Sequence, residues 1–65
     1  MKLDREKIEL IVADKGLKLK DIPIKAGIST ATFSLGINGK RNPSCATIGK
    51  IAKALKVSAK DIIAD

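Results

Sequence analysis

The sequence contains no histidine, tryptophan or tyrosine, and it has one cysteine, Cys45, and one aromatic residue, Phe33. Ser-His-Asp and Cys-His catalytic sets both need histidine, so enzymes of these classes are excluded. A single cysteine forms no internal disulfide, and it makes no zinc cluster alone. No pair of carboxylates falls in a plausible cleft. We therefore expect a protein that is not an enzyme and that holds no metal and no cofactor.

Long hydrophobic runs and an export signal are also missing. The longest uninterrupted apolar stretch covers residues 10–13, whereas a helix needs about 20 residues to span a bilayer. The first seven residues include Asp4 and Glu6 and lack the apolar segment of a signal peptide. Without an export signal or a disulfide framework, we expect a cytoplasmic location and no membrane partner.

Acidic residues are scarce in the second part of the chain. The formal net charge is +6. Residues 22–60 hold seven basic residues and no acidic one: Lys25, Lys40, Arg41, Lys50, Lys53, Lys56 and Lys60. Such a distribution gives the domain one positive side, which is typical of a protein that binds a polyanion. The alternative is a solvated basic surface without a nucleic-acid partner, and Lys50, Lys53 and Lys56 favour that interpretation for their own helix face.

The 65 residues allow one domain, residues 1–65, and their apolar spacing is helical. The pattern predicts a helix over residues 4–15, capped by Asp4, and further helices over residues 19–26 and 29–38. A fourth helix, which Ser44 caps, extends through Leu55, and a short fifth begins at Ser58. We therefore expect an all-α, compact five-helix domain.

Pro23 lies inside the second of these helices. Proline removes an amide donor and disfavours helical geometry at the residue before it. The helix must either begin late, with Pro23 in its first turn, or tolerate a distortion. We expect a short or irregular helix with at least one backbone hydrogen bond missing near Leu19. Replacing Pro23 by alanine should then leave the domain unchanged or stabilise it.

Residues 22–33 have the form of a helix, a glycine turn and a second helix. This form predicts a helix-turn-helix motif over about residues 19–38, in which the second helix places its first side chains against base edges of DNA. Small, uncharged side chains suit that position, and Ser29, Thr30, Ala31 and Thr32 provide them. The alternative is an αα-corner in a purely structural bundle.

Four segments carry a wider resemblance: residues 16–17 (Gly-Leu), 27–29 (Gly-Ile-Ser), 38–44 (Asn-Gly-Lys-Arg-Asn-Pro-Ser) and 51–58 (Ile-Ala-Lys-Ala-Leu-Lys-Val-Ser). In this order they resemble the XRE-type regulators, the Cro and phage-repressor family, over about residues 8–63. The resemblance implies a five-helix lambda-repressor-like fold and sequence-specific binding to double-stranded DNA. It also implies that a homodimer on a two-fold symmetric operator is usual, although the sequence leaves monomer and dimer open.

By resemblance, Thr30, Ala31 and Leu35 occupy base-facing positions. With their polar neighbours, the expected base-reading residues are Ser29, Thr30, Ala31, Ser34 and Leu35. The expected DNA-backbone contacts are Lys18, Lys20, Thr32, Asn38, Lys40, Arg41 and Asn42.

Six positions depart from the family pattern, among them Leu35, which is apolar at a base-reading position. Leu19 stands where a phosphate-binding glutamine is frequent, and Pro23 where a small residue lets the two helices approach. Gly36 replaces a large apolar core residue. Val12 and Ile37 stand where an Arg–Glu pair is common, so we expect these two side chains to be in contact.

The sequence thus predicts a sequence-specific transcriptional regulator, repressor-like and of phage or mobile-element type, with a recognition helix over about residues 29–38 in the major groove. The alternative is a protein-interaction module, such as an antitoxin or adaptor domain, on the same scaffold. No small-molecule ligand is evident. Cys45 is interpreted as a small packing residue, with a reactive thiol as the alternative.

Overall fold

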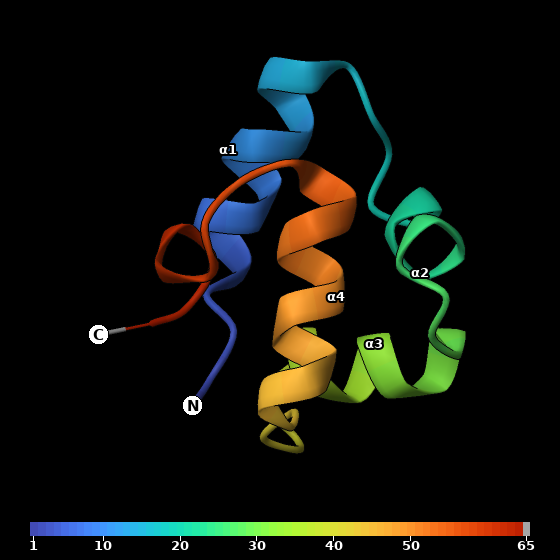
Figure 1. Cartoon of the computed structure of the whole chain (residues 1–65), viewed down its shortest axis with the longest axis vertical. Helices are drawn as coiled ribbons and strands as arrows, with labels where there is room; N and C mark the ends of the chain where they lie inside the picture. The colour runs from blue at the N-terminus through green and yellow to red at the C-terminus, as the bar shows by residue number, and fades with distance from the viewer. Residues whose placement is uncertain (65) are drawn as a thin grey trace.

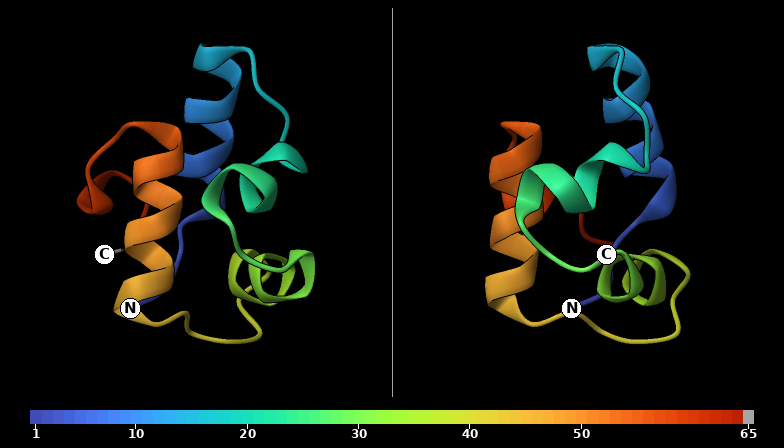
Figure 2. Two further views of the ribbon diagram at one scale, coloured as in Figure 1. Left: turned by 45° about the vertical axis from the view of Figure 1, so that its right-hand side comes forward. Right: turned by 90° about the vertical axis from the view of Figure 1, so that its right-hand side faces the viewer.

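The computed structural model describes residues 1–64 and consists of helices joined by short connections (Figure 1). The helices are α1 (Arg5–Lys15), α2 (Asp21–Ala26), α3 (Thr30–Ile37) and α4 (Cys45–Leu55), followed by the 3₁₀ turn η1 (Ala59–Asp61). The α3 helix runs crosswise to α4, as the views in Figures 1 and 2 both show. The all-α prediction is confirmed. None of the helices within residues 1–64 has the length and apolar character needed to cross a membrane.

The predicted fifth helix is wrong as a helix, because the chain makes only one 3₁₀ turn there. Ser58 and Asp61 form the expected capping box, but the chain then leaves the helical path to pair with the N-terminal segment. The amide of Asp4 donates to the carbonyl of Ile62 at 2.8 Å, and Leu3 forms an isolated antiparallel bridge with Ile63. This pairing takes the backbone groups that a second helical turn would need.

Three helices begin at the predicted caps. The side chains of Asp4, Ser29 and Ser44 accept hydrogen bonds from the amides of Lys7, Thr32 and Thr47, at 3.1, 3.0 and 3.2 Å. Each bond satisfies one of the amides that a helix start leaves without an intrahelical partner. The exception is α2, which has no side-chain cap. Its start is set by the preceding turn instead.

That turn decides between the two alternatives for Pro23, and the late start and the short helix are confirmed. The helix begins late, at Asp21, so Pro23 is its third residue and lies in the first turn. The expected missing hydrogen bond near Leu19 is wrong, because the Leu19 carbonyl accepts from the amide of Ile22 at 3.1 Å. The amide of Asp21 likewise donates to Lys18 at 3.0 Å. Proline therefore removes no bond here, since a first-turn amide has no helical partner to lose.

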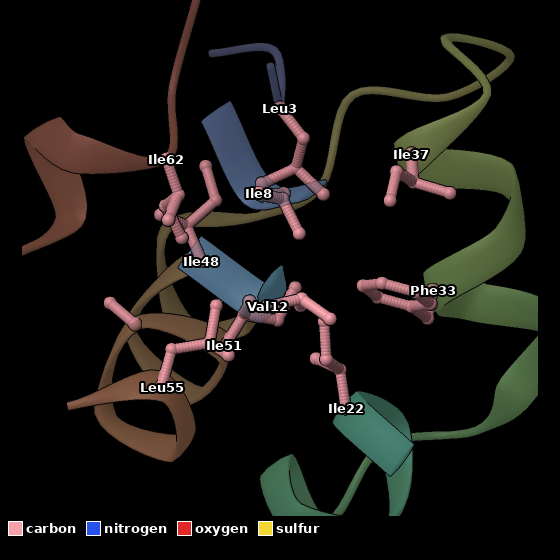
Figure 3. Packing of buried hydrophobic residues seen from close by; sticks show 11 residues of the cluster. Leu3, Ile8, Val12, Ile22, Phe33, Ile37, Ile48, Ile51, Leu55 and Ile62 are labelled. Carbon is pink, nitrogen blue, oxygen red and sulfur yellow. The ribbon is translucent and has the colours of Figure 1, made fainter. Parts of the chain in front are cut away.

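A single apolar cluster holds the helices together (Figure 3). Its largest contributor is α4, which buries Ile48, Ile51, Ala52 and Leu55 on one face. The other buried apolar residues are Leu3, Ile8, Val12, Ile22, Phe33, Ile37 and Ile62. Among the described residues no polar or charged side chain is buried. Each fully buried isoleucine contributes about 1.5–3 kcal/mol relative to an exposed one.

Val12 and Ile37 both point into this cluster from different helices, as Figure 3 shows. The register of α3 that buries Phe33 and Ile37 together is thereby confirmed. The direct contact expected between Val12 and Ile37 stays a prediction.

Gly36 accommodates the N-terminal segment. A Cβ atom added at Gly36 would lie 3.3 Å from Cδ1 of Leu3 and 3.7 Å from Cγ of Pro43. Leu3 is itself buried in the core. The side chain of Leu3 thus takes the space beside α3 that a larger residue at position 36 would enter. Leu3, a residue 33 positions away, therefore fills the space that the departure from the family pattern at Gly36 leaves.

Candidate nucleic-acid interface

The interface is built on α2, a three-residue turn and α3. At the end of α2, Gly27 adopts a left-handed conformation with φ of 71°, and its amide donates to Ile24 at 3.3 Å. The amide of Ile28 donates back to Pro23 at 3.0 Å. These two bonds close the helix end and reverse the chain toward Ser29. No atom lies within 4 Å of a Cβ placed on Gly27, so the backbone angle alone requires glycine.

The α3 helix has one buried and one uncovered face. Phe33, Gly36 and Ile37 are buried, and Leu35 is half-buried. The predicted base-reading residues Thr30, Ala31 and Ser34 are exposed. Figure 2 shows α3 at the edge of the molecule, where one of its sides is free of the other helices. A row of small side chains on an uncovered helix fits against the floor of a DNA groove.

Ser29 differs from the other predicted readers because its hydroxyl is already engaged. It accepts from the amide of Thr32 at 3.0 Å and donates to Oγ1 of Thr32 at 2.7 Å. Both functions of the Ser29 hydroxyl thus hold the first turn of α3. Thr32, predicted to contact the DNA backbone, is half-buried and is held by the same pair of bonds. The geometry assigns Ser29 a structural role at the helix start, beside the exposed Thr30 and Ala31.

The loop after α3 presents the predicted backbone contacts. Gly39 has a φ of 75°, and the amides of Lys40 and Arg41 both donate to the carbonyl of Leu35, at 2.9 and 3.2 Å. These bonds fix the backbone while the side chains of Lys40, Arg41 and Asn42 remain exposed. Two cations therefore stand directly beyond the C-terminal end of α3, on a rigid turn.

The predicted site residues fall into two groups. One group lies at the start of α3 and along it (residues 29–35) and in the loop that follows it (residues 38–42). Lys18 and Lys20 lie in the connection between α1 and α2, at the other end of the helix pair (Figure 2). Both lysines are exposed. The helix pair is thus flanked by cations before α2 and after α3.

One polar side chain at this surface was missed by the sequence prediction. Nη1 of Arg5, at the start of α1, donates to Oδ1 of Asn38 at 2.6 Å. Nδ2 of Asn38 in turn donates to Oγ of Ser34 at 3.3 Å. Arg5 and Asn38 are 33 residues apart, so no local pattern in the sequence could indicate their contact.

Comparison with known protein families identifies the family to which this domain belongs. The model of the Cro/C1-type HTH DNA-binding domain matches residues 7–65. The chain belongs to this family. The resemblance to XRE-type regulators is thereby confirmed, and so is the helix-turn-helix character of the domain. A search of curated proteins finds no match.

As a Cro/C1-type domain, the protein binds double-stranded DNA, and its family is one of transcription regulators. The match begins at Lys7, within α1, and covers α2, α3 and α4 completely. The uncovered face of α3 and the buried cluster, apart from Leu3, therefore lie within the matched residues. Arg5 and Leu3, which contact α3 or pack beside it, lie outside the matched residues.

Proposed function

We propose that this Cro/C1-type domain is a sequence-specific transcriptional regulator of a repressor-like, phage or mobile-element type, with α3 as its recognition helix in the major groove. The observation that carries the proposal is the uncovered face of α3, where Thr30, Ala31 and Ser34 are exposed while Phe33 and Ile37 anchor the opposite face. An α-helix fits the major groove, where the four base pairs present different donors, acceptors and methyl groups.

Affinity in this proposal comes from cations at the DNA phosphates. Lys40 and Arg41 are exposed on the fixed loop after α3, and Lys18 and Lys20 are exposed before α2. Each phosphate that a cation neutralises releases condensed counterions. The logarithm of the binding constant therefore falls with the logarithm of the salt concentration, with a slope of about 0.9 per contact. The acid-free stretch from residue 22 to residue 60 adds a long-range attraction of the same sign. These contacts hold the domain on DNA without reading its sequence.

Specificity comes from the first turns of α3. The hydroxyl of Thr30 can pair with a base edge, and the methyl groups of Thr30 and Ala31 can pack on a thymine methyl. Leu35 is half-buried, so only part of its side chain is available for a similar apolar contact. A domain bound in the groove over a promoter excludes other proteins from that groove, and occupancy alone then represses transcription.

We further propose that two copies bind a two-fold symmetric operator, with recognition helices about 34 Å apart, one turn of B-DNA. The partner is then the DNA of the host or of a mobile element, and the compartment is the cytoplasm. Sedimentation of the free and DNA-bound protein tests the stoichiometry. A single copy bound to a non-palindromic site would contradict the dimer and leave the groove contact intact.

The deciding experiment is selection of binding sites from random double-stranded DNA at about 50 and 200 mM salt. The proposal expects one enriched motif at both concentrations and a steep fall in affinity between them. Binding without any enriched motif would contradict sequence-specific reading.

A second candidate function, a protein-interaction module, is favoured by two apolar side chains on the surface. Leu10 on α1 and Ile24 on α2 are 68% and 77% exposed. An adaptor or antitoxin domain would use such side chains to bind a partner protein with little dependence on salt. The absence of any DNA retardation at about 50 mM salt would support this candidate over the first, because electrostatic attraction to DNA is strong there.

A further inference from the structure

A chain of polar contacts joins the start of α1 to the uncovered face of α3. Nε of Arg5 lies 3.6 Å from Oε2 of Glu9, one turn further along α1. Nη1 of the same guanidinium donates to Oδ1 of Asn38 at 2.6 Å. Nδ2 of Asn38 donates to Oγ of Ser34 at 3.3 Å. The contacts therefore link Glu9 to Arg5, Arg5 to Asn38, and Asn38 to Ser34. Ser34 is a predicted base-reading residue.

The contact with Arg5 fixes which way the Asn38 amide points. A guanidinium has only donors, so it pairs with the amide oxygen and opposes the amide nitrogen. If the Asn38 amide were turned over, its N–H groups would face the N–H groups of Arg5. The bond from a charged donor is also stronger than one between neutral groups. Arg5 therefore holds the amide with its nitrogen, a donor, facing Ser34.

This orientation determines what Ser34 can offer to DNA. A hydroxyl has one proton to donate and lone pairs to accept. Because Asn38 supplies a donor, the Ser34 oxygen accepts, and its proton remains available. Among the described residues, Asn38 is the only side chain to which Ser34 is bonded. In the opposite orientation Asn38 would take that proton and leave Ser34 as an acceptor.

We propose that Arg5 is a positioning residue for base recognition: by fixing the Asn38 amide, it makes Ser34 a hydrogen-bond donor toward the major groove. The base that Ser34 meets should then carry an acceptor there, as guanine does at O6 and N7, adenine at N7 and thymine at O4. This inference rests on the proposed function, because it assumes that α3 faces the groove. It adds a specificity determinant outside the helix-turn-helix.

The proposal concerns orientation and not the stability of the fold. The side chains of Arg5 and Glu9 are 51% and 48% exposed. An ion pair at such exposure contributes little to folding. We therefore expect Arg5→Met to leave the denaturation midpoint unchanged, which allows its effect on DNA recognition to be read without a folding defect.

The first test uses the free protein and does not depend on DNA. NMR relaxation of the side-chain amide groups compares Asn38 with Asn42, an exposed asparagine in the same loop for which the structure shows no side-chain hydrogen bond. Asn38 should be more ordered than Asn42 in the wild type and equally mobile in Arg5→Met. Equal mobility of the two amides in the wild type would overturn the positioning role, whatever the protein binds.

The second test is site selection with Arg5→Met, Ser34→Ala and the double variant. The position read by Ser34 is the one at which Ser34→Ala loses its discrimination against cytosine, the base without a major-groove acceptor. Arg5→Met should reduce the preference at that same position by roughly threefold to tenfold, the range of one hydrogen bond. It should add nothing in the Ser34→Ala background, because its effect passes through Ser34. Arg5→Lys, which keeps the charge and a donor, should retain the preference.

One control variant and two alternative outcomes distinguish this result from others. Lys53→Met removes one exposed charge on α4, away from α3, and should leave the preference unchanged. If Arg5→Met instead weakens binding to all sequences equally and lowers the salt slope by about 1, Arg5 is a phosphate contact and the proposal is overturned. If the wild type binds no DNA, the proposed function fails, and the relaxation experiment still decides whether Arg5 orders Asn38.

Discussion

Replacement of Pro23 by alanine tests how the first motif helix is built. Pro23 is the third residue of α2 and one of the largest fully buried side chains in the molecule. Its ring lacks an amide proton at a position where a helix provides no partner for one. The nearest carbonyl that could serve, that of Leu19, already accepts from Ile22 at 3.1 Å. Alanine would therefore bring a buried amide that has to share the Leu19 carbonyl with the amide of Ile22.

The magnitude follows from the atoms that are lost. Alanine removes two ring carbons from the core, at about 0.8 kcal/mol for each buried methylene. Alanine also increases the conformational entropy of the unfolded chain, which favours unfolding by about 0.4–1 kcal/mol. Together these terms predict a loss of about 2 kcal/mol in the free energy of unfolding. The sign is opposite to the one that the sequence alone suggests for this proline.

Urea denaturation followed by circular dichroism measures the change, and thermal denaturation should show a midpoint lowered by about 8–16 °C, given about 4–8 °C per kcal/mol for a domain of this size. Pro43→Ala is the matched control, because Pro43 is only half-buried and lies in the loop before α4. We expect it to lose less than about 1 kcal/mol. A Pro23→Ala variant as stable as the wild type would refute the reasoning.

Substitutions at three further positions test the helix ends, each by urea denaturation. Gly27→Ala should destabilise the domain by about 1 kcal/mol, because residue 27 has a φ of 71° and alanine disfavours the left-handed region; an unchanged midpoint would count against that strain. Ser44→Ala should also lose about 1 kcal/mol, because the bond to the Thr47 amide is removed; Ser44→Gly should lose only a few tenths. Lys56→Gly should stabilise by about 0.5–1 kcal/mol, because Lys56 has a φ of 59°; a loss of stability would show that its side chain contributes a contact.

The sequence predicts the local features of this fold well. The caps at Asp4, Ser29 and Ser44 and the turn at Gly27 depend on residues within a few positions of one another, so short patterns reveal them. The buried face of α4 is equally visible, because its apolar residues recur at helical spacing. The exposed residues at the start of α3 follow from the same periodicity, which places Phe33 inside.

The sequence does not predict the features that depend on contacts between distant segments. The pairing of Leu3 with Ile63 ends the last helical turn early, and neither residue carries a turn or strand signal. The space beside Gly36 is filled by Leu3, which only the packed structure reveals. The effect of Pro23 depends on where α2 begins, and the sequence pattern alone allows both a late start and a distorted helix.

Two polar contacts, one local and one between distant residues, explain what was missed at the candidate site. Ser29 fits a base-reading position by its type and place, but its hydroxyl is engaged twice by Thr32. Arg5 has no motif around it and reaches Asn38 only because α1 begins beside the end of α3. Hydrogen bonds decide which polar groups remain free for DNA, and tertiary structure sets the partner of Arg5, whereas the partner of Ser29 is three residues away.

The central claim is that α3 reads base edges while the loop after it holds the DNA backbone, and a comparison of Thr30→Ala with Arg41→Ala tests it most directly. Binding of each variant to the selected operator, to its single-base variants and to random DNA is measured over a range of salt concentrations. Thr30→Ala should change discrimination at one operator position by about 1–3 kcal/mol and leave the salt slope nearly unchanged. Arg41→Ala should weaken binding to all sequences alike and lower the salt slope by about 1. Equal effects of the two substitutions on operator and random DNA would contradict the claim.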